Sequence, residues 1–205
     1  MLRFRGRARN LPAIRASIEY RMKNNELHII AQILGGKTEA FSYFMDTYGQ
    51  QVFTLIVRMV DSEEDAEELT QDTFMKAFSH LSSFCGHSSF STWIYRIAYN
   101  TALSALRKRA TQDTFTCDER LWNQLSDSEI DESLDSEEES RIELLKRAIR
   151  RLSPEEQAVV TLFYEEEKSV AELSEILKQT ENNVKVKLHR IRKKLYLLMK
   201  EEEKL

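Results

Sequence analysis

Apolar residues recur three or four positions apart along the first half of the chain, which is the spacing of one face of a helix. Gly35 and Gly36 follow the first such run and can close a helix in the left-handed conformation. Thr38 is expected to cap the second helix, and Asp61 or Ser62 to begin the third. The pattern predicts four helices that pack into one small domain, at about residues 24–34, 38–57, 62–77 and 90–109.

The second half of the chain carries clearer helix signals. After a helix from about Arg141, Ser153-Pro154-Glu155-Glu156 combines a capping serine, a proline at the first helical position and a glutamate at the third. Ser169 and Glu172 repeat the capping-box spacing before a short helix. The last helix has an apolar stripe of Val184, Leu188, Ile191, Leu195 and Leu198. A short helix, a tight turn and a long helix form the helix-turn-helix pattern.

The composition favours an all-α fold. Only five Gly and two Pro occur in 205 residues, so turn formers are too few for a many-stranded sandwich or barrel. Hydrophobic residues make up 41% of the chain, which is enough to bury real cores and argues against wholesale disorder.

The net charge of −4 hides a strong sorting of charge along the sequence. Residues 1–21 hold six arginines against Glu19 and are expected to be a basic, disordered extension, with a DNA-gripping arm or a natural start at Met22 as alternatives. Residues 111–140 hold eleven acidic residues against Arg120, and such a block predicts a flexible linker. The expected organisation is two small helical domains, at residues 22–110 and 141–205, joined by this acidic linker.

The sequence offers no recognisable catalytic or metal-binding pattern. Cys85 and Cys117 lie far apart without metal-type spacing, so we expect two free thiols in a reducing cytoplasm. The histidines are scattered, and no nucleophile elbow or glycine-rich phosphate loop occurs. The uncharged stretch at 77–95 contains six serines and two histidines, so it cannot span a membrane. We therefore expect no enzyme, no metal, no cofactor, no membrane insertion and a cytoplasmic location.

The last predicted helix carries the strongest indication of function. From Lys178 to Lys194 there are seven basic residues against Glu181. A helix in the major groove needs an apolar back, cations that reach phosphates and a few side chains aimed at base edges. The face opposite the apolar stripe holds six candidate DNA contacts: Asn182, Lys185, Val186, His189, Arg190 and Lys193. A basic face that is merely solvated is the alternative.

Two blocks of sequence resemble the sigma-70 family of bacterial transcription initiation factors. DAEELTQDTFMKAF and FCGHSSFSTWIYRIAYNTALSALRKR resemble its region two, and SPEEQAVVTLFYEEEKSVAELSEILKQTENNVKVKLHRIRKKL resembles its region four. The acidic linker and the missing region three resemble the ECF (extracytoplasmic function) subfamily. The resemblance implies a factor that binds core RNA polymerase, directs it to minus-ten and minus-thirty-five promoter elements and helps to open the duplex.

The resemblance also assigns residues and partners. Contacts to core RNA polymerase, through its beta-prime clamp helices, are implied for Asp65, Glu67, Glu68, Gln71, Asp72 and Phe74. Minus-ten DNA contacts are implied for Phe84, Gly86, Ser88, Tyr95, Arg96, Asn100, Arg107 and Lys108, with residues 82–89 as the pocket loop for one extruded base. The six candidates on the last helix would contact the minus-thirty-five element. Further partners are promoter DNA, the polymerase beta flap and, as the resemblance allows, an anti-sigma factor.

Some positions have alternative interpretations or depart from the family pattern. Phe90 and Trp93 fall on the apolar stripe and are expected to be core residues. Lys178 stands where the turn usually has Gly, and a left-handed residue other than Gly costs about 1 kcal/mol. Val186 replaces a small hydroxyl residue and exchanges a hydrogen bond for an apolar contact. Cys85 and His87 differ from the Arg and acidic residues usual in the pocket loop, so the promoter sequence cannot be copied from relatives.

Two other functions remain open on the sequence alone. A stand-alone helix-turn-helix regulator would use only the second domain to bind an operator and would leave the first as a sensor. A helical scaffold protein would bind no DNA. The stand-alone regulator does not explain why aromatic and basic residues gather between residues 84 and 109.

Overall fold

The computed structural model describes residues 25–60, 62–109 and 139–202. Within these ranges all regular elements are helices, so the prediction of an all-α fold is confirmed. The basic extension at 1–21, most of the predicted acidic linker and Cys117 lie outside the described residues. The predicted domain boundaries therefore stay predictions.

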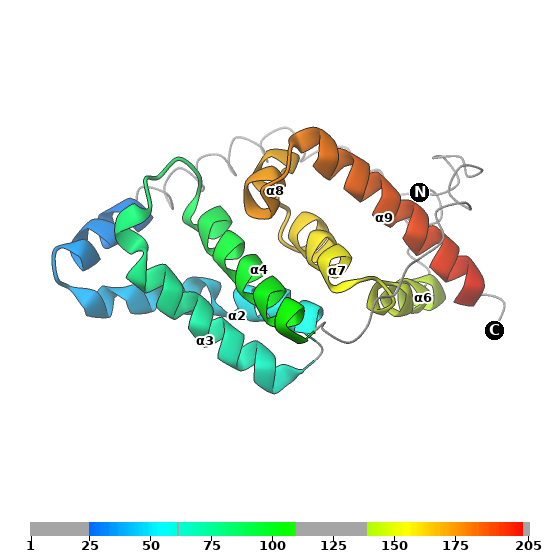
Figure 1. Cartoon of the computed structure of the whole chain (residues 1–205), viewed down its shortest axis with the longest axis horizontal. Coiled ribbons are helices and arrows are strands. Elements are labelled where there is room, and N and C mark those ends of the chain that lie inside the picture. Colours follow the sequence, from blue (N-terminus) through cyan, green and yellow to red (C-terminus); the bar gives the residue numbers. More distant parts are fainter. Residues whose placement is uncertain (1–24, 61, 110–138, 203–205) are drawn as a thin grey trace, which may run out of the picture.

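The N-terminal half is a bundle of helices. A helix at residues 25–34 ends at a turn in which Gly36 has a φ of 105°, as the glycine pair predicts. It is followed by α2 (Ser42–Val60), α3 (Glu63–Ser79) and α4 (Phe90–Arg109), which pack on one another (Figure 1). The Ser62 side chain caps α3 by accepting a hydrogen bond from the Asp65 amide at 3.2 Å.

The predicted cap at Thr38 is wrong. Thr38 begins a short 3₁₀ turn, η1 (Thr38–Phe41), whose start has no side-chain cap. This turn leads directly into α2 and brings Phe41 into the core, where its ring meets the rings of Phe44 and Phe78 at centroid distances of 5.8 and 5.1 Å. Burial of an aromatic ring thus determines how α2 begins.

An aromatic cluster fixes the start of α4. The rings of Phe44 and Phe90 are stacked with centroids 3.9 Å apart, and Trp93 lies 5.4 Å from Phe90. Phe90 is 1% exposed and Trp93 7% exposed, so both are core residues, as expected. Phe84 packs on the same two rings and thereby anchors the loop that precedes α4.

The C-terminal half follows the predicted helix signals closely. It consists of α6 (Glu139–Arg150), α7 (Pro154–Val160), a π-helical turn η4 (Thr161–Glu165), α8 (Val170–Leu177) and α9 (Glu181–Glu202). Both capping boxes are formed, one before α7 and one before α8. Lys178 ends α8 in the left-handed conformation with a φ of 53°, so this lysine adopts the geometry for which glycine is usual.

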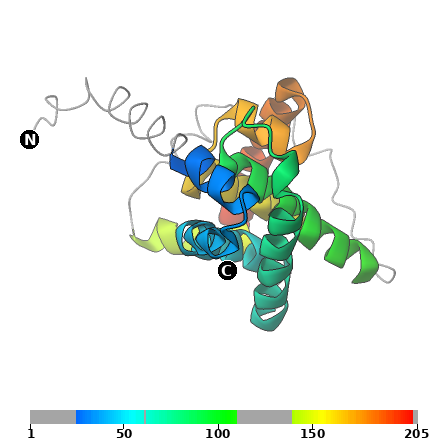
Figure 2. The same cartoon turned by 90° about the vertical axis from the view of Figure 1, so that its left-hand side faces the viewer.

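The two halves pack against each other. α8 packs on α4, and α7 packs on α2. Figure 1 shows α8 beside the first turns of α4, and Figure 2 shows the N-terminal half in front of the C-terminal half. Buried apolar residues from both halves form one continuous core. The prediction of two small helical domains is confirmed, and the structure adds that they share an extended interface.

Candidate nucleic-acid and polymerase interfaces

The predicted reading face of α9 is open to solvent. Its apolar back is buried, from Val184 at 0% exposure to Leu188 at 8%. On the other side of the helix Val186 is 44% exposed. Four further candidates are also exposed: Asn182, Lys185, His189 and Arg190. Lys193 is half-buried. The structure therefore brings these six side chains together on one helix face.

Two basic residues of α9 hold the helix in place. Lys194 donates to Glu156 at 2.7 Å, and Lys187 lies 3.6 Å from Glu155, so both tie α9 to the start of α7. Glu156 is also the capping-box residue of α7, which joins the two helices at a single carboxylate. The basic character of α9 thus serves its packing at these two positions as well as its exposed face.

A pocket of about 590 Å³ lies beside α4. Arg96 and Asn100 of α4, two of the predicted minus-ten residues, line it, and Ser83 is the residue of the predicted pocket loop found in its lining. The Asn100 side-chain amide donates to the backbone carbonyl of Arg96 at 2.6 Å, which orients the amide within the pocket wall. Sequence reasoning missed three further residues that line the pocket: Lys76, His80 and Lys178.

The sequence contains a signal for two of the three missed pocket residues, Lys76 and His80, but none for Lys178. Lys76 and His80 are four residues apart at the end of α3, so they share a helix face, and that spacing could have identified them. Lys178 comes from the turn of the second domain and reaches the pocket only because α8 packs on α4. No local pattern could have predicted its position there.

Tyr95, which the resemblance assigns to the minus-ten site, is buried in this structure, and its DNA contact stays a prediction. It is 1% exposed, and its hydroxyl donates to Glu166 Oε2 at 2.5 Å. Burial and the hydrogen bond to Glu166 raise the pKa of Tyr95 well above its usual value. The hydroxyl of Tyr95 therefore faces the second domain rather than an open DNA-binding surface, because α8 and the segment before it cover this side of α4.

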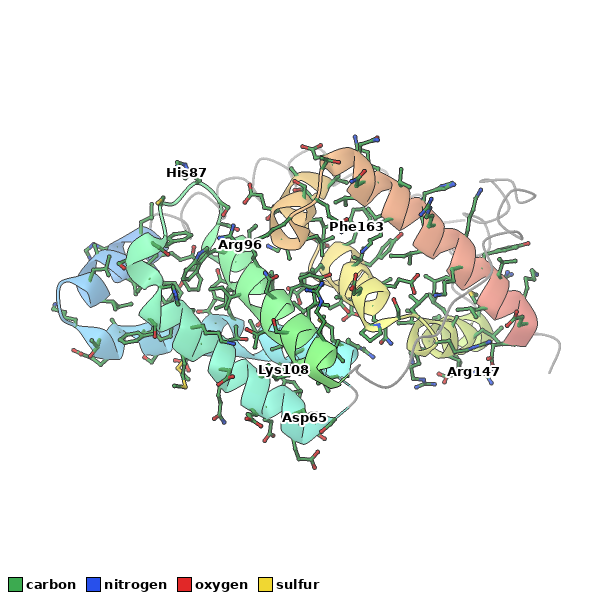
Figure 3. All side chains as sticks on the ribbon, viewed as in Figure 1. Asp65, His87, Arg96, Lys108, Arg147 and Phe163 are labelled. Carbon is green, nitrogen blue, oxygen red and sulfur yellow. The ribbon has the colours of Figure 1, made fainter. Side chains whose placement is uncertain are left out.

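The other predicted minus-ten residues lie apart from the pocket. Phe84 is partly buried against Phe90, and Gly86 turns the loop with a φ of 69°. Ser88 is half-buried, and the exposed His87 stands at the tip of the loop (Figure 3). Arg107 and Lys108 are exposed in the last turn of α4, where Figure 3 labels Lys108. These residues thus lie in the loop before α4 and near the last turn of α4 rather than together.

The acidic face of α3 is largely as predicted. Glu67, Glu68 and Gln71 are exposed, and Asp65 and Asp72 are half-buried. Asp65 lies near the start of α3 (Figure 3). Phe74 is the exception, because it is 5% exposed and its ring packs edge-on against Phe41. Phe74 packs in the core under α3. Its side chain is therefore not on the exposed face to which the predicted contact with core polymerase assigns it.

The described residues contain no group of three or more His, Cys, Asp or Glu that could hold a metal ion. In the same part of the chain, none of the helices has the length and apolar character that a membrane crossing requires. Cys85 is a free, exposed thiol.

Comparison with known proteins agrees with this arrangement. Residues 44–112 match Sigma-70 region 2, and residues 142–195 match Sigma-70 region 4. The ECF RNA polymerase sigma factor SigW of Bacillus subtilis is 30% identical over 172 residues, which are 81% of this chain and 92% of SigW. The chain belongs to the ECF sigma factors. The RNA polymerase sigma factor YlaC of the same organism is 33% identical over 162 residues, 77% of this chain and 92% of YlaC.

Solved structures show the same fold. CnrH, in complex with the cytosolic domain of CnrY, has a TM-score of 0.59 at 21% identity, over 84% of this chain and 95% of CnrH. RpoE of Bartonella quintana, in complex with the anti-sigma factor NepR, has a TM-score of 0.57 at 20% identity, over 78% of this chain and 96% of RpoE. Like other ECF sigma factors, this protein binds core RNA polymerase, recognises minus-ten and minus-thirty-five promoter elements and promotes DNA opening.

Proposed function

We propose that this sigma factor divides promoter recognition between two helices. α9 reads the minus-thirty-five element, α4 and the loop before it read the minus-ten strand, and α3 docks on the beta-prime clamp helices of core polymerase. The observation that carries the proposal is the reading face of α9, which combines an apolar buried back with exposed cationic and amide side chains.

The α9 face has the chemistry of major-groove recognition. Lys185 and Lys193 are suited to phosphates, because an ammonium acts as a point charge. Arg190 can form two parallel hydrogen bonds to a guanine edge, and Asn182 can do the same with an adenine. Val186 is 44% exposed and offers an apolar contact for a thymine methyl group. Specificity at the minus-thirty-five element is therefore assigned to Asn182, Val186 and Arg190.

The pocket beside α4 suits a nucleotide of the opened strand. Lys76, Arg96 and Lys178 supply positive charge for a phosphate, and Asn100 supplies an amide that can pair with a base edge. Among the residues that the structure describes, those that line the pocket include no Asp or Glu. Arg107 and Lys108, farther along α4, are assigned to phosphates of the same strand.

The exposed carboxylates of α3 favour a basic partner. Charge complementarity of this kind raises the association rate constant and orients the two proteins as they meet. Five of the predicted contacts remain on this face: Asp65, Glu67, Glu68, Gln71 and Asp72. We assign this face to core polymerase.

Further properties follow from family membership. Sigma factors are initiation factors rather than enzymes, and we propose that this chain likewise catalyses no reaction and acts in the cytoplasm. CnrH was solved with the cytosolic domain of CnrY and RpoE with an anti-sigma factor, which supports an anti-sigma factor as a partner of this chain too.

Reconstituted transcription tests the proposed function. Promoters selected from random DNA by the assembled holoenzyme are transcribed with core polymerase, the full-length chain or both. Transcripts that require both proteins are expected. Tight, sequence-specific binding of the isolated chain to its promoter, with no change on adding core polymerase, would instead favour the stand-alone regulator.

A further inference from the structure

One buried carboxylate of the first helix is assigned to neither DNA nor polymerase. Glu26, in the helix at residues 25–34, is 4% exposed. It lies on the same helix face as Ile30 and Ile33, which are each 5% exposed, so its side chain points into the core. Burying a charged side chain is costly unless it is paired and hydrogen-bonded. The partners of this carboxylate therefore indicate its role.

The two hydrogen-bond donors to Glu26 lie on two other helices. The Tyr48 hydroxyl of α2 donates to Glu26 Oε1, and the backbone amide of Phe90, the first residue of α4, donates to the same carboxylate. Burial raises the pKa of this carboxyl, and the two hydrogen bonds and the charge of Lys168 lower it in part. Burial and Glu26 raise the pKa of Tyr48 well above its usual value, so its hydroxyl keeps the proton that it donates. We name Glu26, Tyr48 and the Phe90 amide the loop anchor.

The loop anchor fixes the junction between the pocket loop and α4. The first amides of a helix have no partner within the helix. At α4 the Ser89 hydroxyl accepts from the Thr92 amide at 3.1 Å, and Glu26 accepts from the Phe90 amide. Without the carboxylate, the Phe90 amide would lose this acceptor at a residue that is only 1% exposed. The last residue of the pocket loop, Ser89, and the start of α4 therefore depend on Glu26 for their position.

The same helix also supports the middle of the pocket loop. Leu27 follows the anchor carboxylate, and its Cδ2 atom lies 3.5 Å from the position that a Cβ atom at Gly86 would take. Gly86 turns the loop there with a φ of 69°. Nearer the start of the loop, the ring of Phe84 packs on Phe90 with centroids 5.8 Å apart. The pocket loop is thus held near its start by the aromatic cluster, in its middle by Leu27 and at its end by the loop anchor.

We propose that Glu26 is a positioning residue for minus-ten recognition, which holds the pocket loop in the conformation that discriminates among the bases of the opened strand. The inference rests on the proposed assignment of α4 and its loop to that strand. Glu26 itself contacts no DNA, because its carboxylate is buried. A binding site has to be held within about 0.5 Å of its productive geometry. A loop released at one end should therefore lose base discrimination while the helices remain folded.

Base discrimination by the holoenzyme tests the proposal. The probes are four fluorescent non-template strands of a selected promoter, which differ only at the minus-ten position where the wild-type holoenzyme discriminates most strongly, and the readout is anisotropy. Glu26→Ala should lower the affinity for the preferred strand about ten-fold and bring the four affinities close to one another. Glu26→Gln should restore most of the discrimination, because its side-chain carbonyl still accepts from the Phe90 amide.

Ile56→Val is the control for lost stability. It removes one methylene from a fully buried side chain of α2, about two helical turns beyond Tyr48. A merely structural role would lower the active fraction of the protein and weaken binding to all four strands by the same factor. Unchanged discrimination by Glu26→Ala, with or without weaker binding, would overturn the proposal. A Glu26→Gln protein that discriminates no better than Glu26→Ala would overturn it too.

Asn100→Ala distinguishes this inference from the proposed function. If Asn100→Ala weakens binding of the preferred strand and Glu26→Ala leaves discrimination unchanged, α4 reads DNA and only the role of Glu26 is wrong. If only Glu26→Ala changes discrimination, the loop reads the strand without Asn100 and the role of Glu26 stands. If neither variant changes affinity or discrimination, the assignment of α4 and its loop to the minus-ten strand is wrong, and the role of Glu26 is wrong with it.

Discussion

α9 and α4 are both assigned to promoter DNA, yet they meet their surroundings in opposite ways. The reading face of α9 is largely exposed, and Lys187 and Lys194 pair with Glu155 and Glu156 of α7. The first turns of α4 are covered by the second domain, and Tyr95 is hydrogen-bonded to it. The α9 face is therefore accessible to duplex DNA in this arrangement, whereas the first turns of α4 are covered by the other half of the molecule.

The largest expected effect is on the free energy of unfolding, and it concerns the aromatic cluster against which α4 packs. Phe44 is fully buried and stacked on Phe90, so Phe44→Ala should leave a cavity and cost about 3 to 5 kcal/mol of unfolding free energy. Thermal and denaturant unfolding measure the loss. Met45→Ala is the control, because Met45 is 49% exposed and its truncation should change stability by only about 0.5 kcal/mol. Similar losses for both would show that the aromatic cluster does not support α4.

The next largest effect is on the affinity for core polymerase. It concerns the acidic face of α3, which is separate from the residues of α4 and α9 that are assigned to DNA. Asp72 has a half-exposed side chain 4.0 Å from Lys76, and Asp72→Arg would place a cation against a basic partner. Like charges at an interface cost several kcal/mol, so affinity for core polymerase should fall about a hundred-fold or more. Thermal stability should change by only about 0.5 kcal/mol.

Titration of core polymerase with labelled protein gives that affinity. Asp46→Arg, on the exposed surface of α2, is the control for charge reversal away from α3. Normal holoenzyme assembly by Asp72→Arg would mean that core polymerase docks elsewhere on the protein.

The smallest effects separate reading from positioning within α9. Arg190→Ala should cost about 1 to 3 kcal/mol at the base that Arg190 contacts and relax specificity there. Lys193→Ala should weaken holoenzyme binding to all promoters alike and reduce the salt slope by about one. Lys146→Ala, on exposed α6, controls for loss of a charge. If Arg190→Ala weakens every sequence equally, Arg190 contacts a phosphate rather than a base.

The predictions that succeeded are local in sequence. The capping boxes at Ser153 and Ser169, the Ser62 cap and the buried stripe of α9 each depend on residues within one or two helical turns. A period of three to four residues and a cap at a fixed offset contain that information directly. The exposed face of α9 followed from the stripe for the same reason.

The errors and omissions come from contacts between distant residues. Tyr95 and Glu166 are 71 positions apart, and Thr92 and Glu172 are 80 positions apart. Glu172 was predicted only as a capping residue, although its carboxylate also reaches α4. Phe74 matched a docking motif, but the way that α3 packs turns its ring toward Phe41. Periodicity shows that a side chain is buried or exposed on its own helix, and it cannot show which other helix covers it.

In the proposed function, α9 recognises the minus-thirty-five element and α4 recognises the opened minus-ten strand. Permanganate footprinting of the holoenzyme tests this assignment most directly. Asn100→Ala removes an amide from the pocket, a loss of about 1 to 3 kcal/mol for groups left unpaired, so closed complexes should form while unpaired thymines in the minus-ten region largely disappear. A template mismatched across the minus-ten region should restore much of the opening, because the unpairing cost is already met. Arg190→Ala should instead reduce closed-complex formation on both templates. Normal opening of the matched duplex by Asn100→Ala would contradict the account.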